Sequence, residues 1–260
     1  MQQLTIVKIG GNIIDDEARL HSFLKDFCRL RGSKILVHGG GKLATEFGKK
    51  LGIETEYING RRVTDKKTLQ LVTMVYGGLI NKTIVAYLQA NSCNAIGLTG
   101  ADGNIIAANK RPVKDIDYGF VGDINDGVNG VMIKSLLDAG LTPVLAPLTH
   151  DGMGTMLNTN ADTIAQSVAI AMVRQMNVML VYCFEKKGVL GNATDETSVI
   201  ERIDANSFND LLSNGIVSGG MMPKIENALI AVSKGLTRVV IGAAEDLLQL
   251  VEGKAGTQIL

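Results

Sequence analysis

The chain has 260 residues, and its 26 basic and 26 acidic side chains give a formal net charge of zero, which indicates a small-molecule partner rather than nucleic acid. It has no run of about 18 apolar residues to span a membrane, and Lys8 interrupts the apolar start too early for a secretory signal. Cys28, Cys93 and Cys183 have no CxxC spacing, so we expect a reducing cytoplasm and no zinc or redox site.

Strand-like and helix-like segments alternate along the whole chain. Apolar, β-branched runs at 4–9 and 34–39 enclose a helix predicted over 16–30, where apolar residues recur at three and four positions. These three segments form a βαβ unit. Further helices are predicted over 42–51, 65–91, 130–140, 161–173, 207–215, 224–235 and 245–253. Further strands are predicted over 95–100, 142–148, 178–184 and 238–243, with short strands and turns over 104–124 and a terminal segment at 256–260.

The composition of the strands predicts the fold class. Continuously apolar strands are typical of a parallel sheet that is buried between helices on both faces. We therefore expect an α/β protein, a three-layer αβα sandwich with a mostly parallel central sheet. The glycine-rich and turn-rich stretch at 148–158 suggests a boundary between two lobes, 1–150 and 151–260.

Two similar glycine turns follow the first two strands. "VKIGGNI" places Gly10 and Gly11 after the first strand, and "VHGGGKL" places Gly39, Gly40 and Gly41 after the second. The carboxyl ends of parallel strands meet at one edge of a sheet, and the free N–H groups at helix starts there favour anions. Neither turn has the spacing of a P-loop or of a dinucleotide-binding motif. The turns therefore predict two adjacent anion sites, although tight turning alone would also explain such glycines.

Three charged residues point to phosphoryl transfer. Lys8 lies within an apolar strand, where a lysine is costly unless it meets an anion. Lys224 opens a predicted helix, where a cation opposes the helix dipole. In "LNTNADT", either Asn160 or Asp162 could simply cap the following helix. Two lysines at glycine turns with one carboxylate suit a reaction that needs positioning and charge neutralisation more than a nucleophile on the protein.

The motifs together resemble the amino acid kinase family. "VKIGGNI", "VHGGGK", "NGRRVTD", "NTNAD", "SGGMMPK" and "GTQI" occur in that family's order and spacing over essentially the whole chain. Within the family they are most similar to members that phosphorylate the side-chain carboxylate of N-acetyl-L-glutamate in arginine biosynthesis. The resemblance implies ATP as co-substrate, with Mg²⁺ carried by its phosphates and no protein metal site.

The resemblance also implies roles for individual residues. Lys8 and Lys224 would stabilise the transition state, and Asp162 would hold both ammonium groups. The substrate would be bound by Gly40 and Gly41 at its reacting carboxylate, and by Arg62 and Asn158 at its α-carboxylate and acylamide. The nucleotide and its phosphates would be bound by Gly10, Gly11, Gly188, Gly219, Gly220 and Met221. The lobe 1–150 would bind the acylated glutamate and dimerise, and the lobe 151–260 would bind nucleotide.

This chain departs from the family pattern at three places. Glu185, Lys186 and Lys187 precede Gly188 where the family usually has a Thr-Asp or Ser-Asp turn, and Lys42 and Arg61 replace a common proline and leucine. Lys42 and Arg61 are cations beside the acceptor turn and would attract an acceptor with an additional carboxylate, such as N-succinyl-L-glutamate. Alternatively, both residues are simply exposed surface charges.

Two further alternatives and the assembly complete the expectations. A related kinase acting on carbamate, aspartate, glutamate or a nucleoside monophosphate would share the lysine pair, whereas a non-catalytic relative would lack it. His21, His38 and His150 show no triad or metal spacing, and His38 is expected to orient the glycine turn. Since the first strand begins by residue 4, we expect no ring-forming N-terminal helix, no arginine feedback, and a homodimer paired through 65–91.

Overall fold

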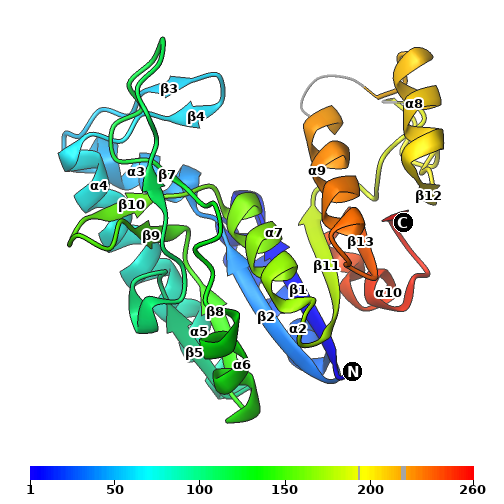
Figure 1. Cartoon of the computed structure of the whole chain (residues 1–260), viewed down its shortest axis with the longest axis horizontal. Helices are drawn as coiled ribbons and strands as arrows, with labels where there is room; N and C mark the ends of the chain where they lie inside the picture. Colours follow the sequence, from blue (N-terminus) through cyan, green and yellow to red (C-terminus); the bar gives the residue numbers. More distant parts are fainter. Residues whose placement is uncertain (193, 218–220) are drawn as a thin grey trace.

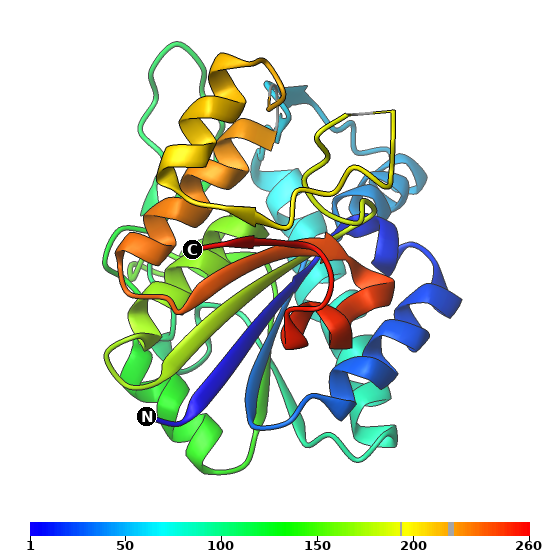
Figure 2. The same cartoon turned by 90° about the vertical axis from the view of Figure 1, so that its right-hand side faces the viewer.

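An eight-stranded sheet forms the centre of the computed structural model, which describes residues 1–192, 194–217 and 221–260 (Figure 1). Its strands are β1 (Gln3–Ile9), β2 (Ser33–His38), β5 (Ala95–Leu98), β8 (Thr142–Leu145), β11 (Asn177–Phe184), β12 (Arg202–Ile203), β13 (Arg238–Ala243) and β14 (Thr257–Ile259). The spatial order is β12-β14-β13-β11-β1-β2-β8-β5, and β13 and β14 pair antiparallel whereas the other neighbours pair parallel. Figure 2 shows the strands fanning out with the usual twist.

Helices cover both faces of this sheet, as the sequence predicts. One face carries α6 (Gly130–Asp138), α7 (Ala161–Met172), α8 (Ala205–Ser213) and α9 (Met222–Ser233). The other carries α1 (Gly11–Ile14), α2 (Glu17–Arg29), α3 (Gly41–Lys50), α4 (Lys66–Val72), the π-helix η1 (Thr73–Ile80), α5 (Asn81–Ala90) and α10 (Leu247–Glu252). Short 3₁₀ turns, η2 (Asp102–Asn104) and η4 (Ala244–Asp246), also occur among the described residues.

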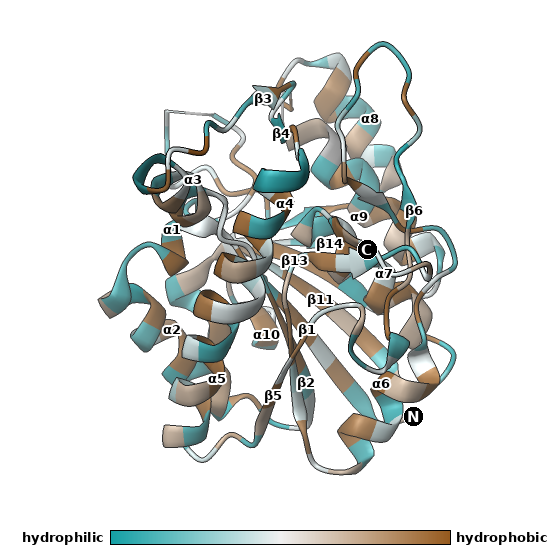
Figure 3. Ribbon diagram, turned by 90° about the vertical axis from the view of Figure 1, so that its left-hand side faces the viewer, coloured by the Kyte–Doolittle hydropathy of each residue, from teal (hydrophilic) through white to brown (hydrophobic). Residues whose placement is uncertain are grey.

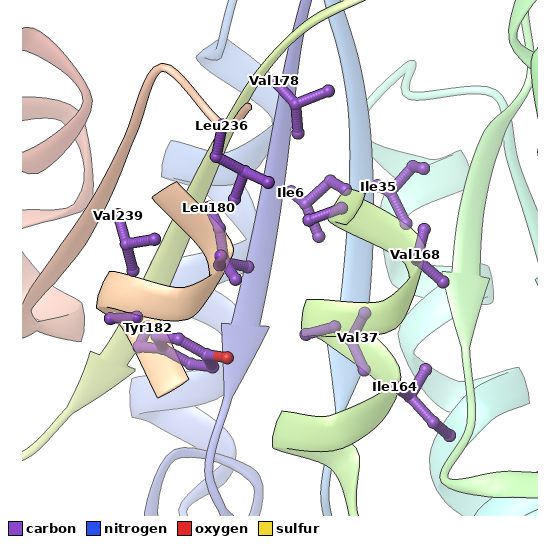
Figure 4. Packing of buried hydrophobic residues seen from close by; sticks show 14 of the residues in the cluster. Ile6, Ile35, Val37, Ile164, Val168, Val178, Leu180, Tyr182, Leu236 and Val239 are labelled. Atoms are coloured by element: carbon purple, nitrogen blue, oxygen red, sulfur yellow. The ribbon is translucent and has the colours of Figure 1, made fainter. Parts of the chain in front are cut away.

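Two apolar clusters, one on each face, hold the layers together. In the first, Ile6 and Ile35 from the sheet meet Ile164 and Val168 from α7 (Figure 4). In the second, residues of α2, α4, η1, α5 and α10 pack on the opposite face. Figure 3 shows the hydrophobic colouring concentrated on the central strands. Burial of apolar surface at about 25 cal/mol per Å² makes these clusters the main source of stability.

The predicted helix over 65–91 is continuous but not uniform, because its middle third is the π-helix η1. By length and composition alone, the 25 residues Lys66–Ala90 could cross a membrane. Leu71, Ile84 and Leu88 of this segment are fully buried in the second cluster, as in a core helix of a globular protein. A π-helical stretch is often found next to a functional site.

Several short elements differ from the prediction. The run 142–148 is two strands, β8 and β9 (Leu148–His150), and only β6 (Asn109–Lys110) and β7 (Gly122–Asp123) form within 104–124. The sequence analysis also missed β12 and the hairpin of β3 (Tyr57–Ile58) and β4 (Arg61–Arg62). Strands of two or three residues carry too little periodic pattern to be recognised.

The glycine-rich stretch at 148–158 is the hairpin of β9 with β10 (Met156–Asn158). The four sheet strands before it, β1, β2, β5 and β8, lie in one half of the sheet, and the four after it lie in the other half. The halves join where β1 pairs with β11 along its whole length. The two segments of the chain thus share one continuous sheet.

Candidate functional site

The two glycine turns lie side by side at the carboxyl edge of the sheet. Ile9 of β1 pairs with His38 of β2, and the Gly39 N–H donates to the Ile9 carbonyl at 3.1 Å. Both turns open helices, α1 after Gly10 and α3 after Gly40. They line a cleft of about 480 Å³, together with side chains from β1, β4, β10, α7 and α9.

Gly40 is required by the fold itself. Its φ is +145°, a conformation that side chains rarely adopt, and a Cβ there would lie 2.3 Å from Cδ1 of Ile80. The ring of Tyr76 would lie 3.3 Å from the same atom. The π-helix η1, which carries Tyr76 and Ile80, therefore packs against the bare backbone of the turn.

His38 supports this turn from beneath. The imidazole is fully buried, its Nδ1 lies 2.8 Å from the Gly39 carbonyl, and its Nε2 lies 3.2 Å from the Asn81 amide nitrogen. The amide can only donate, so Nε2 is the acceptor and Nδ1–H donates to Gly39. Burial lowers the pKa of His38 to about 4. The ring is therefore neutral at physiological pH and holds the turn in place, as the sequence analysis expects.

Lys8 and Asp162 form an ion pair inside the cleft. The Lys8 ammonium lies 2.7 Å from Oδ1 of Asp162, and Lys8 is 7% exposed. The side chain of Asn160 caps α7 by accepting from the backbone N–H groups of Asp162 and Thr163 at 2.8 and 3.1 Å. The structure thus decides between the two candidate caps: Asn160 caps the helix, which leaves the Asp162 carboxylate free for Lys8.

Lys224 reaches the same place from the first turn of α9. Its ammonium lies 3.8 Å from the centre of the Phe184 ring, and that of Lys8 lies 5.4 Å from it. Burial lowers the pKa of Lys224, Asp162 raises it, and Lys8 lowers it further. The sequence analysis missed Phe184, since its position at the end of an apolar strand gives no sign of a cation nearby.

Arg62 is buried beside the second glycine turn. Its guanidinium donates to the Gly41 carbonyl at 2.6 Å, to Thr45 Oγ1 at 2.9 Å and to Thr55 Oγ1 at 3.0 Å. It also donates to the Tyr57 hydroxyl and lies over that ring at 4.8 Å from its centre. Arg62 is therefore not a solvated surface charge. Its contacts hold the guanidinium rigidly at the wall of the cleft.

Asn158 and Arg111 lie on the adjoining wall. The Asn158 amide donates to Thr64 Oγ1 at 2.9 Å, and the backbone of Asn158 is bridged to Val121, next to β7. Arg111, which follows β6, is held by Asp123 through bonds from Nε at 3.1 Å, and this pairing raises the pKa of the arginine. Sequence reasoning missed Arg111 because its place depends on the β6–β7 pairing.

A second cavity of about 380 Å³ adjoins the cleft on the side of α1 and of the segment that follows β11. Gly188 and Met221 line it, as do Gly10 and Gly11, which the two cavities share. The departures from the family pattern, Glu185 and Lys186, also lie in its wall. The expected residues Gly219 and Gly220 lie outside the described residues.

The two extra cations near the second turn have different surroundings. Lys42 is largely exposed and lies 3.9 Å from the buried carboxylate of Asp15, and it does not line the cleft. Arg61 is exposed but does line it. The neighbouring Asp15 has a pKa raised by burial, which Lys42 partly opposes.

Comparison with known proteins identifies the family to which the chain is similar. The model of the amino acid kinase family matches residues 3–243. A protein of Cytophaga hutchinsonii named acetylglutamate kinase is 56% identical, covering 100% of this chain and 99% of that protein. Proteins of the same name from Bacteroides thetaiotaomicron and Methanopyrus kandleri are 52% and 40% identical, covering 99% and 95% of this chain and 98% and 97% of those proteins.

Solved structures show the same fold. The crystal structure of smu.665 from Streptococcus mutans has a TM-score of 0.78 at 29% identity and covers 98% of both chains. N-acetylglutamate synthase from Neisseria gonorrhoeae has a TM-score of 0.82 at 23% identity, covering 99% of this chain and 59% of that chain. Carbamate kinase from Giardia lamblia has a TM-score of 0.68 at 14% identity, covering 100% and 98%.

Proposed function

The chain belongs to the amino acid kinase family, and we propose that it transfers the γ-phosphoryl group of ATP to the side-chain carboxylate of N-acetyl-L-glutamate. The products are ADP and N-acetylglutamyl 5-phosphate, and the reaction is a step of arginine biosynthesis. Relatives of 51–56% identity over nearly the full length carry the name acetylglutamate kinase, which supports this acceptor. The observation that carries the chemistry is the Lys8–Asp162 ion pair at the meeting point of two glycine turns.

The two turns divide the substrates between them. Gly10 and Gly11 face both cavities, so their N–H groups are assigned to the phosphates of ATP. Gly40 and Gly41 line the cleft beside Arg62, so they are assigned to the reacting carboxylate. Hydrogen-bond donors at both turns bring two anions together, which is the main difficulty of this reaction.

Lys8 and Lys224 supply the positive charge that the transferring phosphoryl group requires. Asp162 holds Lys8 directly and acts on Lys224 through its charge. Removing one preorganised stabiliser of this kind typically costs 10²–10³-fold in rate. The acceptor carboxylate, with a reference pKa of about 4.3, is already ionised at neutral pH, so the reaction needs no general base.

Arg62 and Asn158 are assigned to the remote end of the acceptor. Arg62 presents a planar fork that suits the α-carboxylate, and Asn158 supplies an amide for the α-carboxylate and the acylamide. Gly188, Gly219, Gly220 and Met221 are assigned to the nucleotide. We assign Mg²⁺ to the ATP phosphates, because Mg²⁺ in kinase sites is commonly bound through the phosphates of the substrate.

The first 150 residues are assigned to acceptor binding and the remainder to nucleotide binding. Met74 and Leu79, which are 56% and 44% exposed on the segment Lys66–Ala90, support a homodimer that buries this surface. Light scattering tests this assembly, and a monomer would contradict it. We expect the enzyme in the cytoplasm.

Acyl-phosphate formation tests the proposed reaction. The protein is incubated with ATP, Mg²⁺ and hydroxylamine, and the hydroxamate is measured with N-acetylglutamate, N-succinylglutamate or glutamate in parallel. We expect the strongest signal with N-acetylglutamate and none with free glutamate. A preference for the succinyl compound would mean that the substrate is N-succinylglutamate. Arg61, the extra cation in the cleft wall, would then be the candidate partner of the additional carboxylate. No signal with any acceptor would contradict the proposal.

A further inference from the structure

The aromatic ring of Phe184 lies against both lysines of the cleft. Phe184 is the last residue of β11, and its ring stacks near that of Tyr182, with centres 6.1 Å apart. The Lys224 ammonium lies 3.8 Å from the ring centre and the Lys8 ammonium lies 5.4 Å from it. Both distances are within the range of about 6 Å over which the face of an aromatic ring attracts a cation.

The charges around this ring are not balanced. Asp162 pairs with Lys8 at 2.7 Å, and in the part of the chain that the structure describes Lys224 forms no ion pair within 4.0 Å. Burial and the like charge of Lys8 both disfavour the ammonium of Lys224, and they lower its pKa. The face of Phe184 is therefore a favourable contact of the second lysine, in addition to the attraction by the charge of Asp162.

We propose that Phe184 is a positioning residue, which holds the ammonium groups of Lys224 and Lys8 over its ring where the phosphates of the nucleotide arrive. A carboxylate partner would neutralise Lys224, whereas a neutral ring attracts it and leaves its full charge available. An ammonium group has three N–H donors, so Lys224 can donate to an incoming phosphate while the ring of Phe184 still holds it in place. This role rests on the proposed function, because phosphoryl transfer is what requires the charge.

Phe184 has a second possible contribution, which is simple packing. The side chain is partly buried against the first apolar cluster, and it lines both cavities. Loss of packing and loss of ring electrostatics would both follow from Phe184→Leu. The two contributions separate only when the charge distribution of the ring changes and its shape does not.

Fluorinated phenylalanines make that separation. Site-specific incorporation of mono-, di- and trifluorophenylalanine at position 184 progressively weakens the negative face of the ring while nearly keeping its volume. We expect kcat/KM for ATP to fall stepwise with each fluorine, by about 3- to 30-fold in total. The KM for N-acetylglutamate should stay close to that of the unmodified enzyme, because the acceptor is assigned to the second glycine turn and Arg62. The melting temperature should fall only slightly, since a cation–π contact contributes only weakly to stability.

Phe208 of α8 provides the matched control. It is buried in the same apolar cluster, and in the described residues no cation lies over its ring. The same fluorinated residues at position 208 should leave kcat/KM for ATP unchanged. A flat series at position 184, with activity lost only in Phe184→Leu, would overturn the proposal in favour of packing.

Nucleotide binding distinguishes a failure of this inference from a failure of the proposed reaction. Calorimetry with a non-hydrolysable ATP analogue and Mg²⁺ needs no acceptor, and its affinity should decline along the same fluorine series. If the unmodified protein binds the analogue but phosphorylates no acylated glutamate, the acceptor is wrong and a declining series still supports Phe184. If affinity is constant along the series, Phe184 does not hold the lysines.

Discussion

The two glycine turns look alike in sequence but are glycine-rich for different reasons. At Gly40, φ is +145° and a Cβ would lie 2.3 Å from Ile80, so the folded backbone itself excludes a side chain. At Gly10, φ is −86°, which any residue adopts, and the nearest atom to a Cβ is the Lys8 ammonium at 4.0 Å. The second turn is therefore closed by packing, whereas the first is open toward the lysine and the cleft.

This difference separates a structural demand from a functional one. The second turn is wedged between η1 and the neutral His38, which fixes its N–H groups before any substrate binds. The first turn has room for a methyl group in the ligand-free protein. We therefore propose that glycine at position 10 serves the approach of a phosphate, because close approach to a backbone is a common reason for glycine.

The largest effect is expected for Gly40→Ala. Overpacking against Ile80 and the strain of a positive φ should together destabilise the protein by about 2–5 kcal/mol. Urea unfolding followed by circular dichroism measures the loss. The matched control is Gly52→Ala, where φ is +67° and no atom lies within 4 Å of the added Cβ. Equal losses in both variants would show that packing against η1 is unimportant.

The next effect concerns the pH dependence of stability. The folded-state pKa of His38, about 4, is below the unfolded value of about 6.5, so the unfolded chain binds the proton more readily. The stability that neutral His38 contributes is fully present above pH 6.5 and is lost as pH falls toward 4. At pH 5 the loss of unfolding free energy amounts to about 2 kcal/mol. Urea unfolding at pH 7 and pH 5 measures it. His38→Gln should show a smaller pH-dependent loss, and an identical slope would contradict the role of His38.

A smaller effect, on activity alone, is expected for Gly10→Ala. The added methyl group would lie beside the Lys8 ammonium, where the phosphoryl group must approach, so kcat/KM for ATP should fall about 10- to 100-fold. Stability should change by less than about 1 kcal/mol, since the backbone conformation is unstrained. Steady-state kinetics and thermal unfolding test the two halves. A variant that unfolds as readily as Gly40→Ala would remove the distinction between the turns.

The smallest effect is expected for Lys42→Met. Lys42 follows the second turn, but its side chain is 64% exposed and lies 3.9 Å from Asp15. Because the lysine is exposed and the distance to Asp15 is long, the pair contributes less than about 1 kcal/mol, and stability should hardly change. The ratio of hydroxamate formed from N-acetylglutamate and N-succinylglutamate should also stay constant. Arg61→Leu, which alters the cleft wall, is the comparison, and a shift only in Lys42→Met would contradict this placement.

Most of the fold was predicted from the local hydrophobic pattern of the sequence. The alternation of buried strands and amphipathic helices predicted the central sheet and the helical layers, because periodicity reports the environment of each segment directly. It did not show the π-helix η1. The hairpin of β3 and β4 was also missed, although its Asn59-Gly60 turn, with φ of +51° and +73°, is a local hairpin signal. Local pattern also cannot predict the order of the eight strands. In the folded sheet β8 lies between β2 and β5, although β5 precedes it in the chain.

The candidate site divides in the same way. The sequence by itself determined where the glycine turns begin and that Lys8 is an unusual charge in a buried strand, since both are local properties of the backbone and of solvation. Only the tertiary structure decided that the Asp162 carboxylate pairs with Lys8, and that the Phe184 ring contacts Lys224. Those contacts join β1, β11, α7 and α9, and their geometry follows from how the layers pack, which no single segment encodes.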